Sequence, residues 1–238
     1  MDSQMVFRRY ELKYILTRGQ KEKITRKMSS FMKPDNFGRS TIRNIYYDTD
    51  DYRIIRKSLE HPVYKEKLRM RSYAAAGPDD EVFLELKKKY DGVVYKRRMS
   101  LKRSEAEDYV SGLKPVDNPS QISRETDYFL KFYGKIVPKV FISYEREACY
   151  GVKDPEFRLT FDENILWRQD KLSLGEEIFG EPVLDPKLTL MEIKTAAGIP
   201  MWLARTMSEE KIFRSTFSKY GTAYMQMYDK FKGGARYA

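Results

Sequence analysis

The chain has 238 residues, of which 41% are hydrophobic and 14% aromatic, and this composition excludes a disordered protein. The formal net charge of +10 favours a polyanionic partner such as a nucleotide, polyphosphate, nucleic acid or an anionic membrane surface. The single cysteine, Cys149, excludes an internal disulfide, and the single histidine, His61, disfavours a catalytic triad. No apolar run is long enough for a transmembrane helix and the N-terminus lacks the core of a signal peptide, so we expect a cytoplasmic protein.

Hydrophobic periodicity predicts an α+β chain without an interdomain linker, taken here as one domain over residues 1–238. The predicted strands cover residues 7–16, 39–48, 63–73, 81–89, 93–101, 137–150, 157–161 and 187–195, with a short strand within 165–174. The predicted helices cover residues 18–31, 50–59, 104–113, 121–132, 200–208 and 218–230. The dipeptide Asp91-Gly92 is typical of a two-residue turn and predicts a hairpin.

The segment 63–73, VYKEKLRMRSY, is the most informative stretch. Read with the two-residue period of a strand, one face carries four cations and the other is mostly apolar. The cationic face holds Lys65, Lys67, Arg69 and Arg71. Four unpaired cations in a row repel one another, so this face must meet water or an anion.

The same division into a charged and an apolar face recurs in several strands, which hold Lys13, Lys67, Lys87, Lys96, Arg146, Arg158 and Lys194. If helices cover the apolar faces, the charged faces turn toward one another. About eight strands then close into an antiparallel barrel with a cationic bore. Glu11, Glu85 and Glu192 can pair with these cations or hold a divalent metal ion.

A second interpretation places every charged face outside an apolar barrel core. It explains the alternation equally well, but it explains less well the pairs Glu85-Lys87 and Glu192-Lys194 on otherwise apolar strands. The chain contains neither a GxxxxGK[ST] nor a GxGxxG motif, so phosphates would be held by lysine and arginine side chains.

Ten short motifs along the chain together resemble one family. In order they are RRYELKYIL, IYYDTDDY, KEKLRMRSY, VFLELKKK, VYKRR, SYEREACY, FRLTFDENI, LMEIKT, IPMWL and FSKY. The sequence resembles the VTC domain, the catalytic module of vacuolar transporter chaperone polyphosphate polymerases and their bacterial relatives. That domain belongs to the triphosphate tunnel metalloenzyme superfamily. The resemblance implies a closed antiparallel β-barrel of about eight strands with flanking helices.

The resemblance also implies the site residues, because the family's tunnel is lined by basic residues that bind the nucleotide and the growing chain. The implied catalytic cations are Lys67, Arg69, Arg71, Lys87, Lys96, Arg146, Arg158 and Lys219. Lys13 is an implied substrate-binding residue, Tyr144 and Ser218 are secondary phosphate contacts, and strand phase adds Lys194. Glu192 is the implied ligand for Mn²⁺ or Mg²⁺.

Two departures from related patterns bear on function. Many tunnel enzymes begin with ExExK, whereas this chain has Arg9-x-Glu11-x-Lys13, which resembles the VTC branch and argues against a hydrolytic triphosphatase. The eukaryotic proteins also carry a regulatory SPX domain and a membrane segment. We expect neither here, so coupled translocation of the product is not expected.

The activity that the resemblance implies is transfer of the ATP γ-phosphoryl group to a growing inorganic polyphosphate chain. Alternatives are a tunnel-fold triphosphatase, a nucleotide cyclase, or a non-catalytic polyphosphate-binding module. The expected partners are ATP and inorganic polyphosphate. No RNA-recognition or helix-turn-helix signature occurs, so nucleic acid is not expected as a partner.

Overall fold

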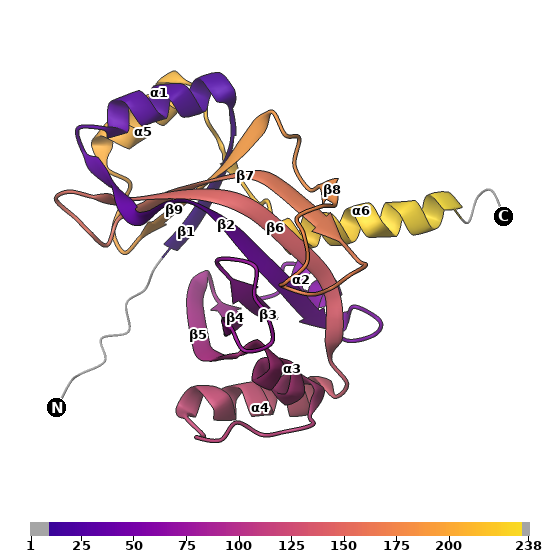
Figure 1. Cartoon of the computed structure of the whole chain (residues 1–238). Coiled ribbons are helices and arrows are strands. Elements are labelled where there is room, and N and C mark those ends of the chain that lie inside the picture. Colours follow the sequence, from indigo (N-terminus) through magenta and orange to yellow (C-terminus); the bar gives the residue numbers. More distant parts are fainter. Residues whose placement is uncertain (1–9, 235–238) are drawn as a thin grey trace.

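The computed structural model describes residues 10–234. The strands are β1 (Tyr10–Thr17), β2 (Met32–Asp48), β3 (Tyr64–Ser72), β4 (Glu81–Tyr90), β5 (Val93–Lys102), β6 (Val137–Gly151), β7 (Arg158–Arg168), β8 (Glu181–Pro182), β9 (Leu188–Thr195) and β10 (Arg214–Ser215). The helices are α1 (Arg18–Met28), α2 (Arg53–Leu59), α3 (Arg103–Ser111), α4 (Gln121–Tyr133), α5 (Met201–Glu209) and α6 (Lys219–Gly234). Figure 1 shows these elements in chain colours. No helix in the described range is long and apolar enough to cross a bilayer.

The order of the predicted elements is confirmed, and several bounds are corrected. Residues 7–9 of the first predicted strand, including Arg9, lie outside the described part of the chain. β2 begins well before the predicted residue 39, because its first residues pair with the end of β6, and a register shift between Pro34 and Arg39 accommodates the turn-forming residues. β7 joins the predicted strand 157–161 to the start of the segment 165–174.

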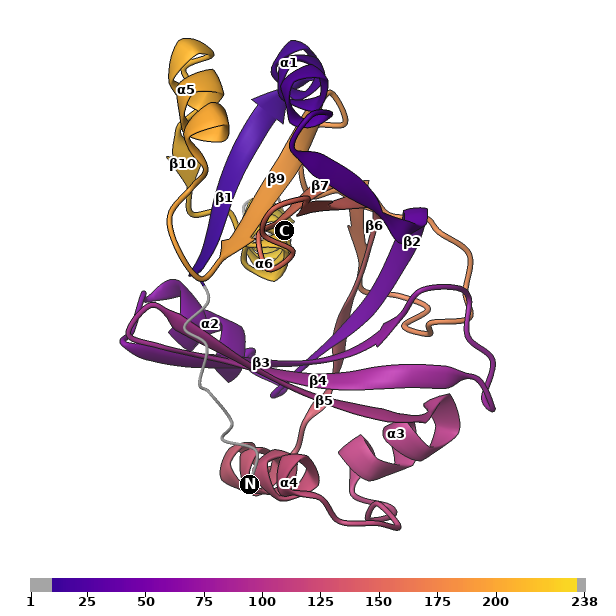
Figure 2. The ribbon, with the colours of Figure 1, turned by 90° about the vertical axis from the view of Figure 1, so that its left-hand side faces the viewer.

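The main sheet is antiparallel throughout and curls strongly (Figure 2). Its strand order is β10-β1-β9-β7-β6-β2-β3-β4-β5, and β8 pairs with β7. Within residues 10–234 the backbone ladder does not continue from β5 to β1. An ion pair bridges this gap instead, with Lys87 Nζ of β4 2.8 Å from Glu11 Oε2 of β1. The expected barrel is therefore a curled sheet in which an ion pair joins β4 to β1, each of which neighbours an end strand.

The hairpin between β4 and β5 forms where the sequence predicts it. Tyr90 pairs with Val93, which leaves Asp91 and Gly92 as a two-residue turn with φ of 43° and 80°. Positive φ at both central residues is the requirement of a type I′ turn, which asparagine, aspartate and glycine meet at low cost. This turn fixes the register that sets Lys87 opposite Lys96.

Helices α1, α3, α4 and α5 cover the convex face of the sheet. The apolar side chains of β3 and β4, Leu68, Met70, Leu84 and Leu86, are buried in one cluster with Tyr109 of α3 and Phe129 of α4. A second cluster joins α1 and α5 to β1, β7 and β9. The charged faces consequently turn toward the concave side, and the interpretation that placed them outside is wrong.

Part of the concave side is apolar. Tyr220, Ala223 and Met227 of α6 pack with Ile142 and Tyr144 of β6 in a third buried cluster. The Tyr220 ring stacks on Tyr46 at a centroid distance of 4.8 Å. α6 therefore fills one region of the concave face and places its first residues beside the charged region.

Candidate functional site

Strands β3, β4 and β5 align their concave side chains in cross-strand rows. In the outermost row Lys65 lies opposite Lys89, and in the next row Lys67 lies opposite Lys87, which in turn lies opposite Lys96. Like charges directly opposite one another destabilise a sheet. The middle row is compensated in part, because Lys87 contacts Glu11 and Lys96 contacts Glu85, and the remaining positive charge of these rows favours an anionic ligand.

The third row has a carboxylate at its centre, with Arg69 and Arg98 on either side of Glu85. Arg69 donates to Glu85 Oε2 from Nε at 2.8 Å and from Nη2 at 2.7 Å. Arg98 Nε donates to Oε1 at 2.8 Å, and Lys96 Nζ lies 2.7 Å from the same oxygen. Burial raises the pKa of Glu85, but Arg69, Arg71 and Lys96 outweigh it and hold the pKa far below its usual range.

Arg71 is buried deeper in the same face. Its Nε donates to Asn44 Oδ1 at 2.9 Å and its Nη2 to the Tyr144 hydroxyl at 2.9 Å. Its Nη1 lies 3.9 Å from Glu85 Oε2. Arg71 therefore has neutral partners at two positions and only a distant carboxylate, so much of its charge remains available to a ligand.

A second charged cluster lies on the opposite wall, where the carboxylates of Asp162 and Glu192 share two cations. Arg146 binds Asp162 with two bonds of 2.6 and 2.7 Å and reaches Glu192 Oε2 at 3.2 Å. Lys219 Nζ donates to Asp162 Oδ2 at 2.5 Å and to Glu192 Oε1 at 3.1 Å. Lys13 Nζ lies 3.4 Å from Glu192 Oε1. These ion pairs assemble residues from β1, β6, β7, β9 and α6.

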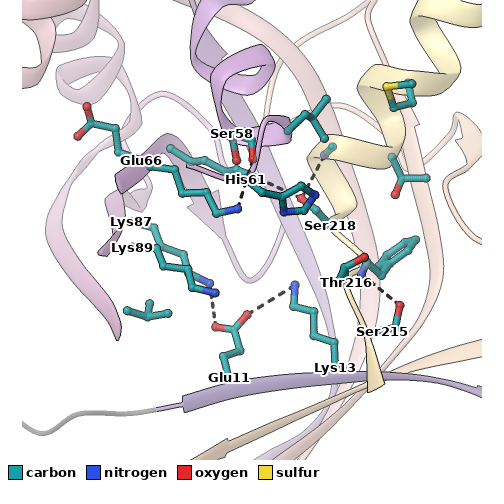
Figure 3. A pocket seen from close by; sticks show the side chains of 18 of the residues that line it. Glu11, Lys13, Ser58, His61, Glu66, Lys87, Lys89, Ser215, Thr216 and Ser218 are labelled. Atoms are coloured by element: carbon teal, nitrogen blue, oxygen red, sulfur yellow. Dashed lines mark hydrogen bonds and ion pairs between the residues drawn. The ribbon is translucent and has the colours of Figure 1, made fainter. Parts of the chain in front are cut away.

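A cavity of about 690 Å³ opens beside these clusters. Figure 3 shows Lys87 and Lys89 on one side of it, Glu11 and Lys13 on another, and His61 and Ser218 near the opposite wall. Its lining contains five lysines, namely Lys13, Lys65, Lys67, Lys87 and Lys89. Glu11, which binds Lys87, and Glu66 are its two carboxylates. The cavity is therefore a strongly cationic part of the concave face.

Lys67 is one of the site cations that have no carboxylate partner among the described residues. Its Nζ donates to Ser218 Oγ at 3.0 Å, and no carboxylate within residues 10–234 lies at ion-pair distance from it. Burial together with Lys13 and Lys87 lowers the pKa of Lys67 to about 7. Burial likewise lowers the pKa of Lys96 and of Lys194 to about 8. Such shifts mark a site whose positive charge exceeds what the protein itself neutralises.

The structure brings most of the predicted site residues together on the concave side. These are Lys13, Lys67, Arg69, Arg71, Lys87, Lys96, Tyr144, Arg146, Glu192, Lys194, Ser218 and Lys219. Arg158 differs, because it is exposed at the start of β7, opposite Lys194 in register, and forms no recorded ion pair with another described residue. It lies at the rim and not inside the charged clusters.

Four further residues belong to the site although the sequence did not single them out as site residues: Lys65, Lys89, Arg98 and Asp162. Strand phase could have found three of them, since Lys65 and Lys89 share faces with Lys67 and Lys87, and Arg98 shares its face with Lys96. Asp162 lies two residues from Thr160 on the face that carries Glu192, and alternation alone did not reveal its partners.

Glu192 is the carboxylate of this site that could hold a divalent cation, together with phosphate oxygens of a bound substrate. No group of three or more histidine, cysteine or acidic residues suited to a metal was found in the described range. Glu192 has Lys13, Arg146 and Lys219 on its two oxygens. Mg²⁺ is commonly held by one or two carboxylates together with substrate phosphates. Glu192 fits that mode, in which a phosphate would take over its cationic partners.

Comparison with solved structures returns distant likenesses. A candidate adenylate cyclase from Vibrio parahaemolyticus gives a TM-score of 0.47 at 11% identity, over 91% of this chain and 97% of the other. A candidate adenylate cyclase from Bacillus halodurans gives 0.45 at 16% identity, over 94% and 90%. The Mediator head module of Schizosaccharomyces pombe gives 0.43 at 10% identity, over 85% and 90%. At these TM-scores none of them bears on activity.

Comparison at the level of sequence is more decisive. No curated protein matches the chain. The family model of the VTC domain matches residues 8–228, which include every element from β1 to the greater part of α6. This span contains all of the cations and carboxylates described above. The chain therefore belongs to the VTC domain family.

Proposed function

We propose that this protein is an ATP-dependent polyphosphate polymerase that works in the cationic concave face of its sheet. The observation that carries the proposal is Lys67, a half-buried lysine that faces a cavity of about 690 Å³ among other cations and without a carboxylate partner among the described residues. A polyanion is the ligand that relieves this charge. ATP and a polyphosphate chain both present closely spaced anionic oxygens to it.

In the proposed reaction a terminal oxygen of the polyphosphate chain attacks the γ-phosphorus of ATP. The bond from the γ-phosphorus to the bridging oxygen breaks, and ADP leaves with the electron pair. Arg69, Arg71 and Arg146 would hold equatorial phosphate oxygens, since arginine presents paired donors to phosphate. Lys219 and Lys67 would neutralise the charge on the transferred group and on the acceptor. Mn²⁺ or Mg²⁺ bound through Glu192 would supply further charge neutralisation.

The carboxylates of the concave face support transfer to phosphate over hydrolysis. Cationic partners outweigh burial and lower the pKa values of Glu11, Glu85, Asp162 and Glu192. A carboxylate with a depressed pKa is a weak general base and activates water poorly. An acceptor phosphate is already ionised and needs no base. The chemistry of the site therefore favours alignment and charge neutralisation as the means of catalysis.

The test is incubation of the purified protein with ATP and Mn²⁺ or Mg²⁺, with polyphosphate followed by gel electrophoresis and ADP by a coupled assay. A ladder of chains with a matching amount of ADP is the expected result. Free phosphate without chains would identify a triphosphatase, and a cyclic nucleotide would identify a cyclase. Tight polyphosphate binding without turnover would leave a binding module.

A further inference from the structure

The outermost row of the concave face, Lys65 with Lys89, has no assigned role in phosphoryl transfer. Lys65 and Lys89 are direct cross-strand partners, and both line the cavity of about 690 Å³. Lys65 Nζ has only a backbone acceptor, Ser58 O at 3.3 Å. Neither lysine forms a recorded ion pair with a carboxylate of the described residues. Their repulsion is left uncompensated at the mouth of the site.

The balance of charge changes along the three rows. The innermost row has Glu85 between two arginines, and the middle row has three lysines that reach Glu11 and Glu85 only through Lys87 and Lys96. The outermost row has two lysines and no carboxylate partner. Uncompensated positive charge is therefore larger in the two outer rows than in the innermost row, and only the outermost row has no carboxylate partner at all among the described residues. Successive rows lie about 7 Å apart along the strands, so the three rows extend over about 14 Å.

Resting on the proposed function, we infer that Lys65 and Lys89 clamp the polyphosphate chain beyond the reacting phosphates and so determine the length of chain that the protein retains. A triphosphate held by Arg69, Arg146 and Lys219 is neutralised in the interior and does not need the outermost row. A longer chain extends past Lys67 and contacts Lys65 and Lys89 as it leaves the cavity.

The lining of the opening fits a polyphosphate chain. Opposite the lysines lie hydroxyl groups of Ser58, Ser215, Thr216 and Thr222, which can donate to phosphate oxygens. Single-stranded nucleic acid is bound mainly by a series of aromatic rings that stack the bases. Phe217 is the one phenylalanine, tyrosine or tryptophan among the described residues that line this cavity.

The experiment compares wild type with the double variant Lys65→Gln/Lys89→Gln in direct binding to tripolyphosphate and to a polyphosphate chain of some tens of units. The variant should lose at least tenfold in affinity for the long chain and less than threefold for tripolyphosphate. The slope of log affinity against log salt for the long chain should fall by about 1.4, at roughly 0.7 per lost phosphate contact by analogy with single-stranded nucleic acid. In the polymerase assay, at an equal amount of ADP formed, the variant should make more chains of shorter length.

The control variant Lys23→Gln/Lys131→Gln removes the same charge from exposed positions on α1 and α4. It should bind both ligands as wild type does. Equal losses for both ligands, or none, in the Lys65/Lys89 variant would overturn the clamp, as would tighter binding of an RNA oligonucleotide than of polyphosphate by the wild type. Because binding is measured without turnover, an inactive wild type that binds long chains through these lysines would refute the polymerase and leave the clamp standing.

Discussion

Glu85 permits the sharpest test of the electrostatic argument. Its side chain is 1% exposed, and it is the shared partner of Arg69, Lys96 and Arg98, with Arg71 at 3.9 Å. The substitution Glu85→Gln preserves the size of the side chain and removes its charge. Four cations then face one another without a carboxylate. Removal of one member of a buried ion pair costs about 3–5 kcal/mol, and we expect a loss of free energy of unfolding of that size.

The assay is urea denaturation of wild type and variant, with and without tripolyphosphate. Removal of Glu85 makes the concave face more positive, so tripolyphosphate should stabilise the variant more than it stabilises wild type. Glu22→Gln is the matched control, because Glu22 is 60% exposed and pairs with Arg18, which is 89% exposed, so the expected change is within about 0.5 kcal/mol. A loss as small as that of the control, or a smaller effect of tripolyphosphate on the variant than on wild type, would refute the reasoning.

Three further predictions follow from the same contacts. Glu192→Gln should abolish chain synthesis and the metal dependence of ATP binding while the circular dichroism spectrum is unchanged; synthesis at the wild-type rate would contradict the metal role. The pKa of Lys67, about 7, lies below its value in the unfolded chain, so the ligand-free protein should gain stability as the pH rises from 7 toward 9. Polyphosphate affinity should fall over the same pH range, because binding needs the charged amine. The substitution Lys67→Met should flatten both trends, with stability measured by denaturation and affinity by calorimetry. Asp48→Asn should lower the free energy of unfolding by about 1–3 kcal/mol, because Asp48 accepts hydrogen bonds from the backbone of Ile54 and Ile55 and from the Tyr220 hydroxyl. A denaturation midpoint equal to that of wild type would show that these hydrogen bonds do not contribute to stability.

Strand alternation predicted which face of β3 and β4 is charged, and the structure confirms it. The period of two assigns Lys67 and Arg69 to one face and Leu68 and Met70 to the other, whichever way the sheet curls. Alternation could not decide whether the charged face lies inside or outside. That depends on which face of the sheet the helices cover. The packing of α3 and α4 on the apolar face is set by contacts between residues distant in the sequence, which the strand pattern does not contain.

The partners within the site were less predictable. Asp162 binds Arg146 from the neighbouring strand and Lys219 from α6, so its role depends on β-sheet register and on the placement of a helix far along the chain. The long β2 was also missed in part, since Pro34 and Gly38 predict a break. The pairing of Met32 and Pro34 with the end of β6 overrides that local preference.

The pairing of β1 with β9 has a consequence for the order of folding. Lys13 meets Glu192 in that ladder, and Lys219 follows still later in the chain. During synthesis from the N-terminus, the lysines and arginines of β3 to β5 are complete long before Asp162 and Glu192 have been made. Contacts of such large sequence separation form slowly, and domains of this size commonly pass through intermediates. We expect the β1–β9 ladder to form late, so that the basic strands β3 to β5 are present before the contacts of Glu192 with Lys13 and Lys219 can form.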